Sequence, residues 1–285
     1  VDNDPTTLHA TELAFAVERL SVDSASFAQM ISVGEGDPAT RVVTAIRDTV
    51  AARGKQQNPV TGSGGMLLGT IAAAGEQAEL ARHGLAIGDR VATLVSLTLT
   101  PLFLDEIQEV DLERHQVRVR GTAILFDAAG CAKLPADLPE RVALSALDVA
   151  GAAPQVTRLV QPGHRVLILG CGGKSGLLCS AAARAGGATV VVGVERSEAA
   201  AQGARRLGAC DHVLVADAAD ALAVSDAAVA AGGDLFDLTV SCVNVANAEM
   251  GAILATRDGG TIYFFSMATS FAQAALGAEG VLRDV

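Results

Sequence analysis

The sequence predicts an α/β protein, in which a β-rich, barrel-like N-terminal domain precedes a doubly wound parallel sheet of the Rossmann type. Three observations support this fold class. A strand, glycine turn, helix and strand are legible in order at residues 164–195, βα alternation follows them, and short alternating strands come before them. We therefore expect two domains, residues 1–150 and 151–285, which suits a chain of 285 residues.

The unit at 164–195 has the order of a dinucleotide-binding βαβ motif. A β-branched apolar run, Arg165–Leu169, leads into the glycine turn, and a second run, Thr189–Val194, ends on Glu195. Such glycines allow a tight turn that brings backbone N–H groups against a pyrophosphate, and the helix N-terminus adds about half a positive charge. The predicted pyrophosphate turn consists of Gly170, Gly172, Gly173, Lys174, Ser175 and Gly176.

The turn departs slightly from the usual pattern, because it reads G-x-G-G-x-x-G. A P-loop is the rival interpretation, since residues 173–175 spell Gly-Lys-Ser, but that motif needs a glycine where Ile168 stands. Glu195 should accept the ribose hydroxyls and repel a 2′-phosphate, which favours NAD over NADP. Arg196 could hold that phosphate if Glu195 swung away, so NADP stays possible.

Further cofactor contacts are expected where later strands end. Asp217 ends the predicted third strand and either flanks the adenine or caps the next helix. Strands four and five end at Val243–Asn244 and Phe265–Ser266, where the adenine-side ribose and the nicotinamide normally pass. Residues Val243, Asn244, Phe265 and Ser266 are therefore included in the predicted cofactor site.

The other elements follow from hydrophobic periodicity and from turn residues. In the first domain we expect strands at 12–22, 66–73 and 91–97, a helix at 38–53, a glycine-rich loop at 55–69, and short strands over 102–126 broken at Gly121. Two linker helices are expected at 140–151 and 153–160. In the second domain we expect helices at 197–207, 218–231 and 246–255, strands at 212–215, 235–242 and 261–265, and a helix start at 270–276. A full sheet of this type has a sixth strand, so we expect that the sequence is truncated at its C-terminus.

Composition narrows the class of partner and the compartment. The net charge of −11 argues against nucleic acid or an anionic membrane and favours a positively charged substrate. The five cysteines, at 131, 171, 179, 210 and 242, form no C-x-x-C pair, which indicates free thiols in a reducing cytoplasm. Uninterrupted apolar runs stay below about 18 residues, so no membrane span is predicted.

Several phrases resemble a known group of enzymes. Residues 88–91 (GDRV), residues 160–166 (VQPGHRV) and the glycine turn are collinear with the medium-chain dehydrogenase/reductase superfamily. Within it, the chain resembles the L-erythro-3,5-diaminohexanoate dehydrogenase family. The phrases that carry this resemblance are NPVTGSGGMLLGT (58–70), ATLVSLTLTP (92–101), AILFDAAGCAKLP (123–135), GGKSGLLC (172–179), TRDGGTIYFFSMATSF (256–271) and AALGAEGV (274–281).

The resemblance implies NAD-dependent oxidative deamination of L-erythro-3,5-diaminohexanoate to 5-amino-3-oxohexanoate and ammonia, a step of lysine fermentation. It makes the first domain the substrate and catalytic domain and the second the dinucleotide-binding domain. The partner would be a small diamino acid, and we expect a homodimer. Two alternatives stay open: a zinc-independent medium-chain reductase acting on a carbonyl or enoyl substrate, and a non-catalytic NAD-binding fragment.

Many members of the superfamily bind a catalytic zinc, and the resemblance places its first two ligands here. The first position holds Asp23, and the second falls in residues 62–64, which read Gly-Ser-Gly. A zinc site needs three strong nitrogen, sulfur or oxygen ligands, which these residues do not supply. We therefore predict that the protein uses no metal.

Without zinc, a carboxylate is the expected partner for an amine substrate. Asp23 is our first candidate, because it follows an apolar strand; the alternative is an Asx-turn or helix-capping role. Asp148 is the second, because it lies in an apolar linker helix, where an unpaired buried charge is costly; the alternative is a salt bridge between domains.

The glycine-rich loop supplies the remaining candidates. Ser63 and Thr61 could hydrogen-bond the amine or relay a proton, although simple turn chemistry also explains them. The substrate carboxylate needs cationic or N–H donors, and those available are Lys55, Arg53 and the backbone of Gly64 and Gly65.

Overall fold

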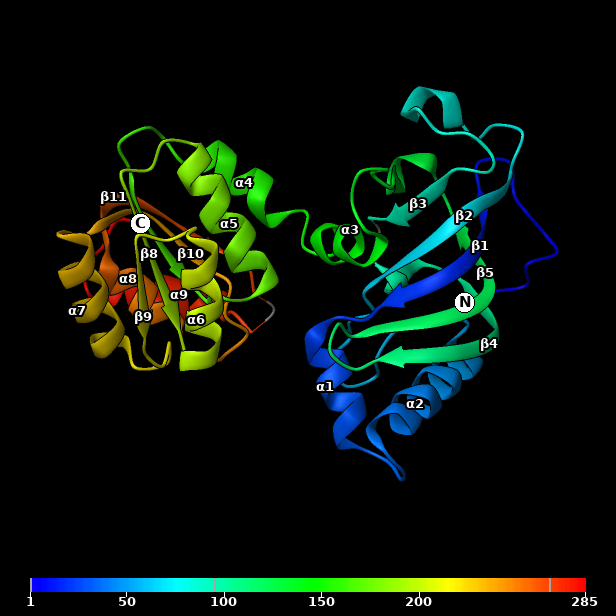
Figure 1. Cartoon of the computed structure of the whole chain (residues 1–285), viewed down its shortest axis with the longest axis horizontal. Helices are drawn as coiled ribbons and strands as arrows, with labels where there is room; N and C mark the ends of the chain where they lie inside the picture. The colour runs from blue at the N-terminus through cyan, green and yellow to red at the C-terminus, as the bar shows by residue number, and fades with distance from the viewer. Residues whose placement is uncertain (1, 95, 267) are drawn as a thin grey trace. The chain divides into compact units, whose positions relative to one another are not determined.

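The structure, a computed structural model, describes residues 2–94, 96–266 and 268–285. Two compact units make up the chain, Val1–Asp148 (unit 1) and Val149–Val285 (unit 2). Unit 1 carries an antiparallel sheet and unit 2 a parallel sheet, so the α/β class predicted from the sequence is confirmed (Figure 1). The division between the units falls close to the expected boundary at residue 150.

In the described part of unit 1, six strands form one sheet in the order β4-β5-β1-β2-β3-β6, with neighbours antiparallel. The strands are β1 (Leu13–Ser21), β2 (Met66–Ala74), β3 (Arg90–Thr93), β4 (Leu102–Asp111), β5 (Gln116–Leu125) and β6 (Cys131–Lys133). The helices are α1 (Ser24–Ser32), α2 (Pro38–Arg53) and α3 (Glu140–Leu147), with short 3₁₀ turns η1 (Leu80–His83), η2 (Leu97–Leu99) and η3 (Ala128–Gly130).

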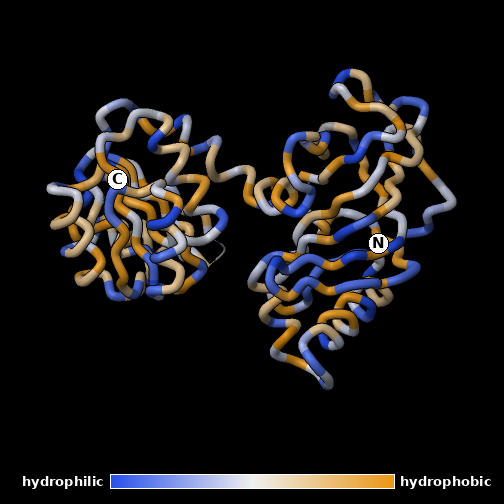
Figure 2. The backbone as a smooth tube through the Cα atoms, viewed as in Figure 1, coloured by the Kyte–Doolittle hydropathy of each residue, from blue (hydrophilic) through white to orange (hydrophobic). Residues whose placement is uncertain are grey.

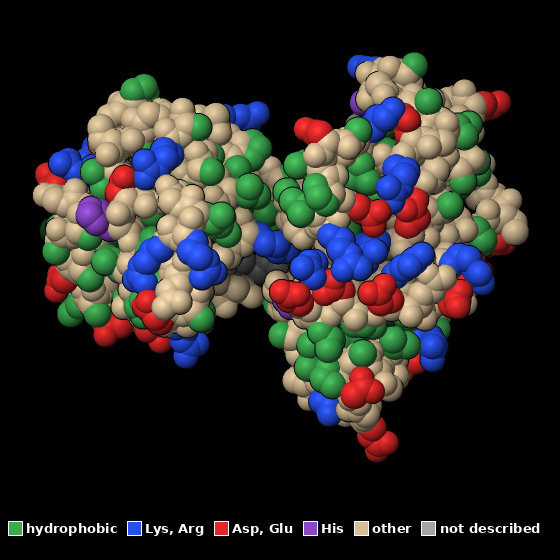
Figure 3. Space-filling view, in the orientation of Figure 1, with side chains coloured by type: hydrophobic (Ala, Val, Ile, Leu, Met, Phe, Trp, Pro, Cys, Tyr) green, Lys and Arg blue, Asp and Glu red, His purple; other side chains and the backbone are tan. Residues whose placement is uncertain are grey.

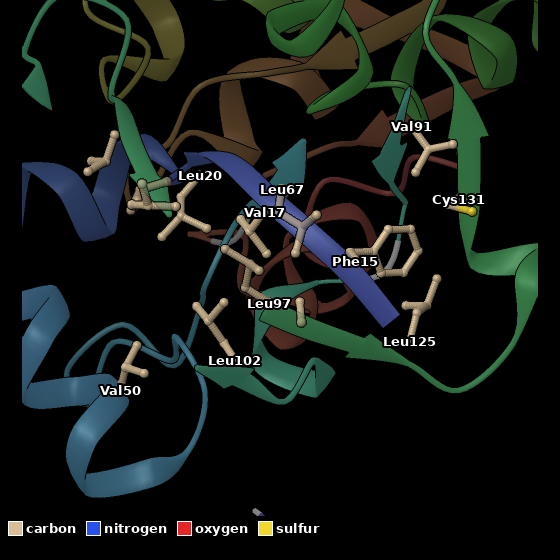
Figure 4. Packing of buried hydrophobic residues seen from close by; sticks show 14 of the residues in the cluster. Phe15, Val17, Leu20, Val50, Leu67, Val91, Leu97, Leu102, Leu125 and Cys131 are labelled. Atoms are coloured by element: carbon tan, nitrogen blue, oxygen red, sulfur yellow. The ribbon is translucent and has the colours of Figure 1, made fainter. Parts of the chain in front are cut away.

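The core of unit 1 follows from the alternation in β1. Leu13, Phe15 and Val17 project to one face of the sheet and are buried, because side chains in a strand alternate between faces. Figure 4 shows Phe15 and Val17 pointing into one cluster with side chains from several other elements. Phe27 of α1 and Ile46 of α2 belong to the same cluster, so these helices cover that face of the sheet.

Ion pairs connect the start of α3 to strands β1 and β3 of the sheet. Arg90 on β3 contacts Glu18 on β1 at 2.6 Å and Glu140 at the start of α3 at 2.7 Å. Arg19 on β1 contacts the other oxygen of Glu140 at 3.1 Å. The hydrogen bonds with Glu18 and then Glu140 raise the pKa of Arg90 above its ordinary value. Basic and acidic side chains are interleaved on the face of unit 1 seen in Figure 3.

Several element predictions for unit 1 need correction. Helix α1 was not predicted; it begins directly after β1 because Asp23 caps it. The region 102–126 forms two long strands rather than several short ones, and Gly121 lies inside β5. A Cβ on Gly121 would stand 2.2 Å from the carbonyl oxygen of Phe103 on β4, so this glycine permits a close strand approach and does not break the strand. The predicted strand at 91–97 ends at Thr93, and residue 95 lies outside the described residues.

Within residues 149–266 and 268–285, five parallel strands form a sheet in the order β11-β10-β7-β8-β9. The strands are β7 (Arg165–Leu169), β8 (Val190–Glu195), β9 (His212–Val215), β10 (Phe236–Ser241) and β11 (Thr256–Phe264). The helices are α4 (Ala152–Leu159), α5 (Lys174–Ala185), α6 (Glu198–Leu207), α7 (Ala221–Gly232), α8 (Glu249–Ala255) and α9 (Phe271–Gly280). The expected alternation is confirmed, although β11 starts earlier than the predicted strand at 261–265.

Both faces of this sheet are covered, as in a doubly wound fold. Ile168 of β7 packs in one cluster with Cys179 and Ala183 of α5, whereas Leu167 packs in a second cluster with Val224 of α7 and Ala252 of α8. Because β7 and β8 are buried on both faces, their residues are largely apolar, and hydrophobic segments are visible inside unit 2 in Figure 2.

Asp237 ties three neighbouring strands of unit 2 together. Its Oδ2 accepts a hydrogen bond from the backbone N–H of Arg165 on β7 at 2.8 Å, and its Oδ1 accepts one from Nε of Arg257 on β11 at 2.7 Å. Burial opposes its ionisation, but these two hydrogen bonds, together with the charges of His164 and Arg257, lower the pKa of Asp237 below its ordinary 3.8. The ionised carboxylate therefore stabilises the folded state.

Asp237→Asn is expected to lower the free energy of unfolding at neutral pH by about 1–3 kcal/mol, because one charge-assisted bond is lost. Since the pKa is depressed in the folded state, the stabilisation is complete above 3.8 and is lost as the pH falls through the folded-state value. Urea unfolding of wild type and variant should therefore differ at neutral pH and converge well below pH 3.8. A difference independent of pH would show that the carboxylate charge is not what stabilises this corner.

Candidate functional site

The predicted dinucleotide turn lies at the point where the strand order of unit 2 reverses. β7 is flanked by β8, which follows it through α5, and by β10, which comes later in the chain. Ligands of open α/β sheets bind at this switch point, beyond the carboxyl ends of the strands. Gly170 follows β7 with φ +81°, and a Cβ there would stand 3.0 Å from Cγ1 of Val243, which follows β10.

A cavity of about 230 Å³ opens at this switch point. Seven residues of the predicted cofactor site line it: Gly170, Gly173, Glu195, Arg196, Asp217, Val243 and Asn244. The structure adds residues that the sequence reasoning missed, among them Cys242 and Ala218. The sequence does point to them, because Cys242 directly precedes Val243 and Ala218 directly follows Asp217, and both neighbours are predicted cofactor residues.

The glycine turn has the shape that a pyrophosphate requires. A Cβ on Gly176 would stand 2.0 Å from the carbonyl oxygen of Gly170, so only glycine lets α5 pack this closely on the turn. Helix α5 begins at Lys174, and its N-cap residue is Gly173, which has no side chain to cap the helix. On Gly173, by contrast, a Cβ would meet only ordinary contacts. These residues fit a bound dinucleotide, because the closely packed glycine turn and the N-terminus of α5 lie beside the cavity.

Glu195 is held against this turn. Its Oε1 accepts a hydrogen bond from the N–H of Gly172 at 2.7 Å, and its Oε2 accepts one from the N–H of Arg196 at 3.2 Å. The carboxylate thus lines the cavity in a fixed position at the end of β8. The Arg196 side chain is 77% exposed and its Nε lies 4.0 Å from Oδ2 of Asp217, so it is only loosely held.

The remaining predicted cofactor residues lie around this core of the site. Ser175 belongs to the first turn of α5 together with Lys174. Phe265 follows β11 and donates its N–H to the carbonyl oxygen of Ser241 at 2.9 Å. The Oγ of Ser266 lies 3.4 Å from Oδ1 of Asn244, which brings the ends of β10 and β11 together.

In unit 1, the glycine-rich loop packs against the start of α1. Asp23 caps that helix, because its Oδ1 accepts a hydrogen bond from the N–H of Ser26 at 2.9 Å. Its Oδ2 is buried and has no hydrogen-bond partner within the described residues. The hydroxyls of Ser26 and Thr61 are hydrogen-bonded, and the N–H of Ser63 donates to Oγ1 of Thr61 at 3.3 Å. The capping alternative for Asp23 is therefore present in the structure.

Three more predicted residues, Lys55, Gly64 and Gly65, contact the chain on the other side of this loop. Lys55 donates from Nζ to the carbonyl oxygen of Thr98 at 2.7 Å. A Cβ on Gly64 would stand 2.4 Å from the carbonyl oxygen of Gln56, and a Cβ on Gly65 would stand 2.0 Å from that of Ser21. Asp23, Lys55, Thr61, Ser63 and Gly64 thus gather in one neighbourhood of unit 1.

A second cavity, of about 210 Å³, places Asp148 beside this loop. Gly65 and Met66 line it together with Leu147 and Asp148, which lie at the end of α3. Thr93, the last residue of β3, and Ser96, which follows that strand, also line the cavity and are not among the predicted residues. Gly65 connects the two regions, because it lines the cavity and also packs on Ser21 and Val22, just before Asp23.

Over residues 2–94, 96–266 and 268–285, three or more His, Cys, Asp or Glu side chains nowhere come together as a metal ion would require. In the same ranges, every helix is too short or too polar to cross a membrane. Metal-free chemistry stays a prediction.

The sequence of the chain is similar to that of one family of dehydrogenases. The N-terminal domain of L-erythro-3,5-diaminohexanoate dehydrogenase, as a family model, matches residues 1–135. The dehydrogenase of that name from Acetoanaerobium sticklandii is 48% identical over 288 aligned residues, which cover 100% of this chain and 83% of that protein. This chain belongs to the L-erythro-3,5-diaminohexanoate dehydrogenase family. The family member from Fusobacterium nucleatum is 45% identical over 98% of this chain and 81% of its own length.

Solved structures show the wider fold of this family. A mycobacterial quinone oxidoreductase is similar with a TM-score of 0.62 and 19% identity, over 98% of this chain and 74% of that one. The apo JamJ enoyl reductase is similar with a TM-score of 0.63 and 14% identity, over 100% of this chain and 74% of that one. These neighbours share the medium-chain dehydrogenase/reductase fold, and at such identities the likeness concerns the fold alone.

Proposed function

We propose that this protein is an NAD-dependent amine dehydrogenase that converts L-erythro-3,5-diaminohexanoate, water and NAD⁺ to 5-amino-3-oxohexanoate, ammonia and NADH. The observation that carries the proposal is the 48% identity to a dehydrogenase of that name, which extends through both units. In unit 2, the cavity at the switch point is lined by the acidic residues Glu195 and Asp217 and suits a dinucleotide. In unit 1, the cavity lined by Asp148 suits an amine substrate. The proposed reaction needs both a cofactor site and a substrate site.

Unit 2 would hold the dinucleotide. The N-terminus of α5 and the turn at Gly170–Gly173 suit a pyrophosphate, and Glu195 suits the ribose hydroxyls. Asp217, Val243 and Asn244 would line the rest of the nucleotide's path. When bound, NAD⁺ supplies a hydride acceptor.

Unit 1 would hold the diamine. Asp148 lines its cavity together with Gly65, Met66 and Leu147, and a carboxylate there attracts an ammonium group and can accept its proton. The amine must lose a proton before a hydride can leave C3, so a base must contact the nitrogen. We assign that contact to Asp148, which lines the cavity together with Thr93 and Ser96.

The other predicted residues of unit 1 would position this cavity. Asp23 holds the start of α1, to which Thr61 is hydrogen-bonded, and Ser63 is bonded in turn to Thr61. Lys55 donates a hydrogen bond to the carbonyl oxygen of Thr98, and Gly64 packs closely against the backbone of Gln56 and Thr98. In this proposal, Asp23 passes from first to second candidate for the base, because its unpartnered oxygen is enclosed whereas Asp148 faces a cavity.

The test is NADH formation from 3,5-diaminohexanoate and NAD⁺, compared with secondary alcohols under the same conditions and with NADH oxidation by quinones and enoyl compounds. Ammonia released in equal amount with NADH would establish deamination. Turnover of an alcohol, quinone or enoyl compound, with none of the diamine, would replace this proposal with the reductase alternative. Dinucleotide binding without turnover of any of these substrates would instead support the alternative of a non-catalytic NAD-binding fragment.

Coenzyme choice is expected to depend on Glu195. NADPH should bind at least about tenfold more weakly than NADH, since a fixed carboxylate repels the 2′-phosphate by about 1.4 kcal/mol or more. Glu195→Gln should narrow that ratio, because the amide keeps an acceptor for the N–H of Gly172 and removes the charge. Fluorescence titration with both coenzymes measures the ratio. Arg196→Ala is the matched comparison, and an unchanged ratio in Glu195→Gln would contradict the assignment.

A cytoplasmic location and a homodimer complete the proposal. The cysteines described, Cys131, Cys171, Cys179, Cys210 and Cys242, are free thiols, which suits a reducing compartment. Light scattering of the purified protein measures its mass and tests the dimer.

A further inference from the structure

Two cysteines of unit 2 meet above Gly193 in the middle of β8. A Cβ on Gly193 would stand 2.5 Å from Sγ of Cys171 and 2.9 Å from Sγ of Cys210. Both sulfur atoms therefore occupy the space that any larger residue at position 193 would fill. Cys171 belongs to the glycine turn, between Gly170 and Gly172, whereas Cys210 precedes β9.

The two thiols differ in exposure and in acidity. Cys171 is fully buried, whereas Cys210 is partly exposed. The hydrogen bond with Cys210, together with burial, raises the pKa of Cys171. The same hydrogen bond lowers the pKa of Cys210 to about 7 against the effect of burial, with help from Ser180 and Arg184. An accessible thiolate with a protonated thiol beside it is the arrangement of a reactive and a resolving cysteine.

We propose that Cys171 and Cys210 form a redox-active dithiol that a hydroperoxide converts to a disulfide. The Cys210 thiolate attacks the peroxide, the O–O bond breaks, and a sulfenic acid forms on Cys210 as one water equivalent leaves. The Cys171 thiol then displaces the sulfenic hydroxyl as a second water, and the S–S bond forms. Two thiols lose two electrons in total, and one hydrogen peroxide becomes two waters.

The disulfide would reach the dinucleotide site through the turn. An S–S bond of about 2.05 Å is shorter than a thiol–thiol hydrogen bond, so Cys171 or Cys210 must move when it forms. On the Cys171 side, the next residue, Gly172, donates its N–H to Glu195. On the Cys210 side, Oγ of Ser180 lies 3.3 Å from Sγ of Cys210 and donates a hydrogen bond to the carbonyl oxygen of Gly176. Oxidation should therefore displace the turn that would hold the pyrophosphate. This consequence rests on the proposed function.

A second thiol pair makes the proposal specific. Cys179 on α5 and Cys242 after β10 are also hydrogen-bonded, and that bond lowers the pKa of Cys179. Cys179, however, is fully buried, so peroxide cannot reach the thiol of this pair that ionises more readily. In unit 1, burial raises the pKa of Cys131 to about 11. Of these three settings, only Cys210 combines exposure with a lowered pKa.

The test treats the reduced protein with hydrogen peroxide in slight excess, alkylates the remaining thiols, and maps disulfides by peptide mass spectrometry with and without reductant. The same samples are titrated with NADH by fluorescence. We expect a peptide cross-linked through Cys171 and Cys210, and a rise in the Kd for NADH on the order of tenfold, which is the loss of one charge-assisted hydrogen bond. Dithiothreitol should reverse both changes.

Variants separate the possible outcomes. Cys210→Ser should abolish the cross-link and leave the Kd for NADH unaffected by peroxide, Cys171→Ser should also abolish the cross-link, and Cys131→Ser should behave as wild type. Retention of all thiols after peroxide, or a cross-link between Cys179 and Cys242, would overturn the proposed pair. A Cys171–Cys210 disulfide with unchanged NADH affinity would overturn its coupling to the turn. Failure of the reduced protein to bind NADH would instead reject the proposed cofactor, because the disulfide is mapped independently.

Discussion

Asp148→Asn is expected to lower kcat/KM for 3,5-diaminohexanoate by about two to four orders of magnitude, the usual contribution of a general base. The side chain keeps its size and its place at the end of α3, so the cavity between Leu147 and Gly65 should persist. What the amide lacks is the negative charge that attracts an ammonium group and the basicity that removes its proton. Initial rates with the diamine and NAD⁺ measure the loss, while NADH titration checks that unit 2 is intact.

Two other Asp-to-Asn substitutions in unit 1 serve as comparisons for Asp148→Asn. Asp137 is an exposed residue of the same unit, so Asp137→Asn should keep wild-type rates. Asp23→Asn should retain the cap of α1, because asparagine accepts the same hydrogen bond from Ser26, and should cost much less activity than Asp148→Asn. A loss in Asp23→Asn as large as the one predicted for Asp148 would return Asp23 to the role of base. Wild-type kinetics in Asp148→Asn would reject Asp148.

Gly176→Ala is expected to weaken NADH binding by roughly ten- to hundredfold and to lower the free energy of unfolding by about 1–3 kcal/mol. The added Cβ would stand 2.0 Å from the carbonyl oxygen of Gly170 and 2.7 Å from Cα of Cys171, and backbone atoms cannot give way as a flexible side chain can. Helix α5 must therefore move away from the turn, and the N–H donors at its start move with it. NADH titration and urea unfolding measure the two effects.

Gly203→Ala is the matched control for this substitution. Gly203 lies inside α6, where a Cβ would meet only the end of the Arg206 side chain at 3.9 Å. Alanine favours a helix interior by about 1 kcal/mol over glycine, so this variant should be as stable as wild type or more stable, with unchanged NADH affinity. Equal behaviour of the two variants would show that close packing at Gly176 is unimportant.

Helix α1 illustrates what local sequence left ambiguous. The pair Asp23-Ser24 is compatible with either a catalytic acid or a helix cap, and the sequence pattern does not predict the short helix that follows. Its nine residues carry a weak periodic signal, and it is stabilised by burial of Phe27 and Met30 against the sheet. Similarly, Gly121 suggested a strand break, because glycine usually interrupts a strand pattern. Only the neighbouring strand β4 shows that the position needs glycine for close approach.

The sequence by itself determined the fold class, the strand–turn–helix–strand unit with its terminal Glu195, and the family, because these depend on local periodicity and on contiguous phrases. The tertiary structure decided which distant residues share a site. It brought Gly65 and Asp148 to one cavity, Val243 to Gly170, and Cys171 to Cys210 across Gly193. These pairings depend on strand order and on close backbone approach, which residue spacing along a chain does not encode.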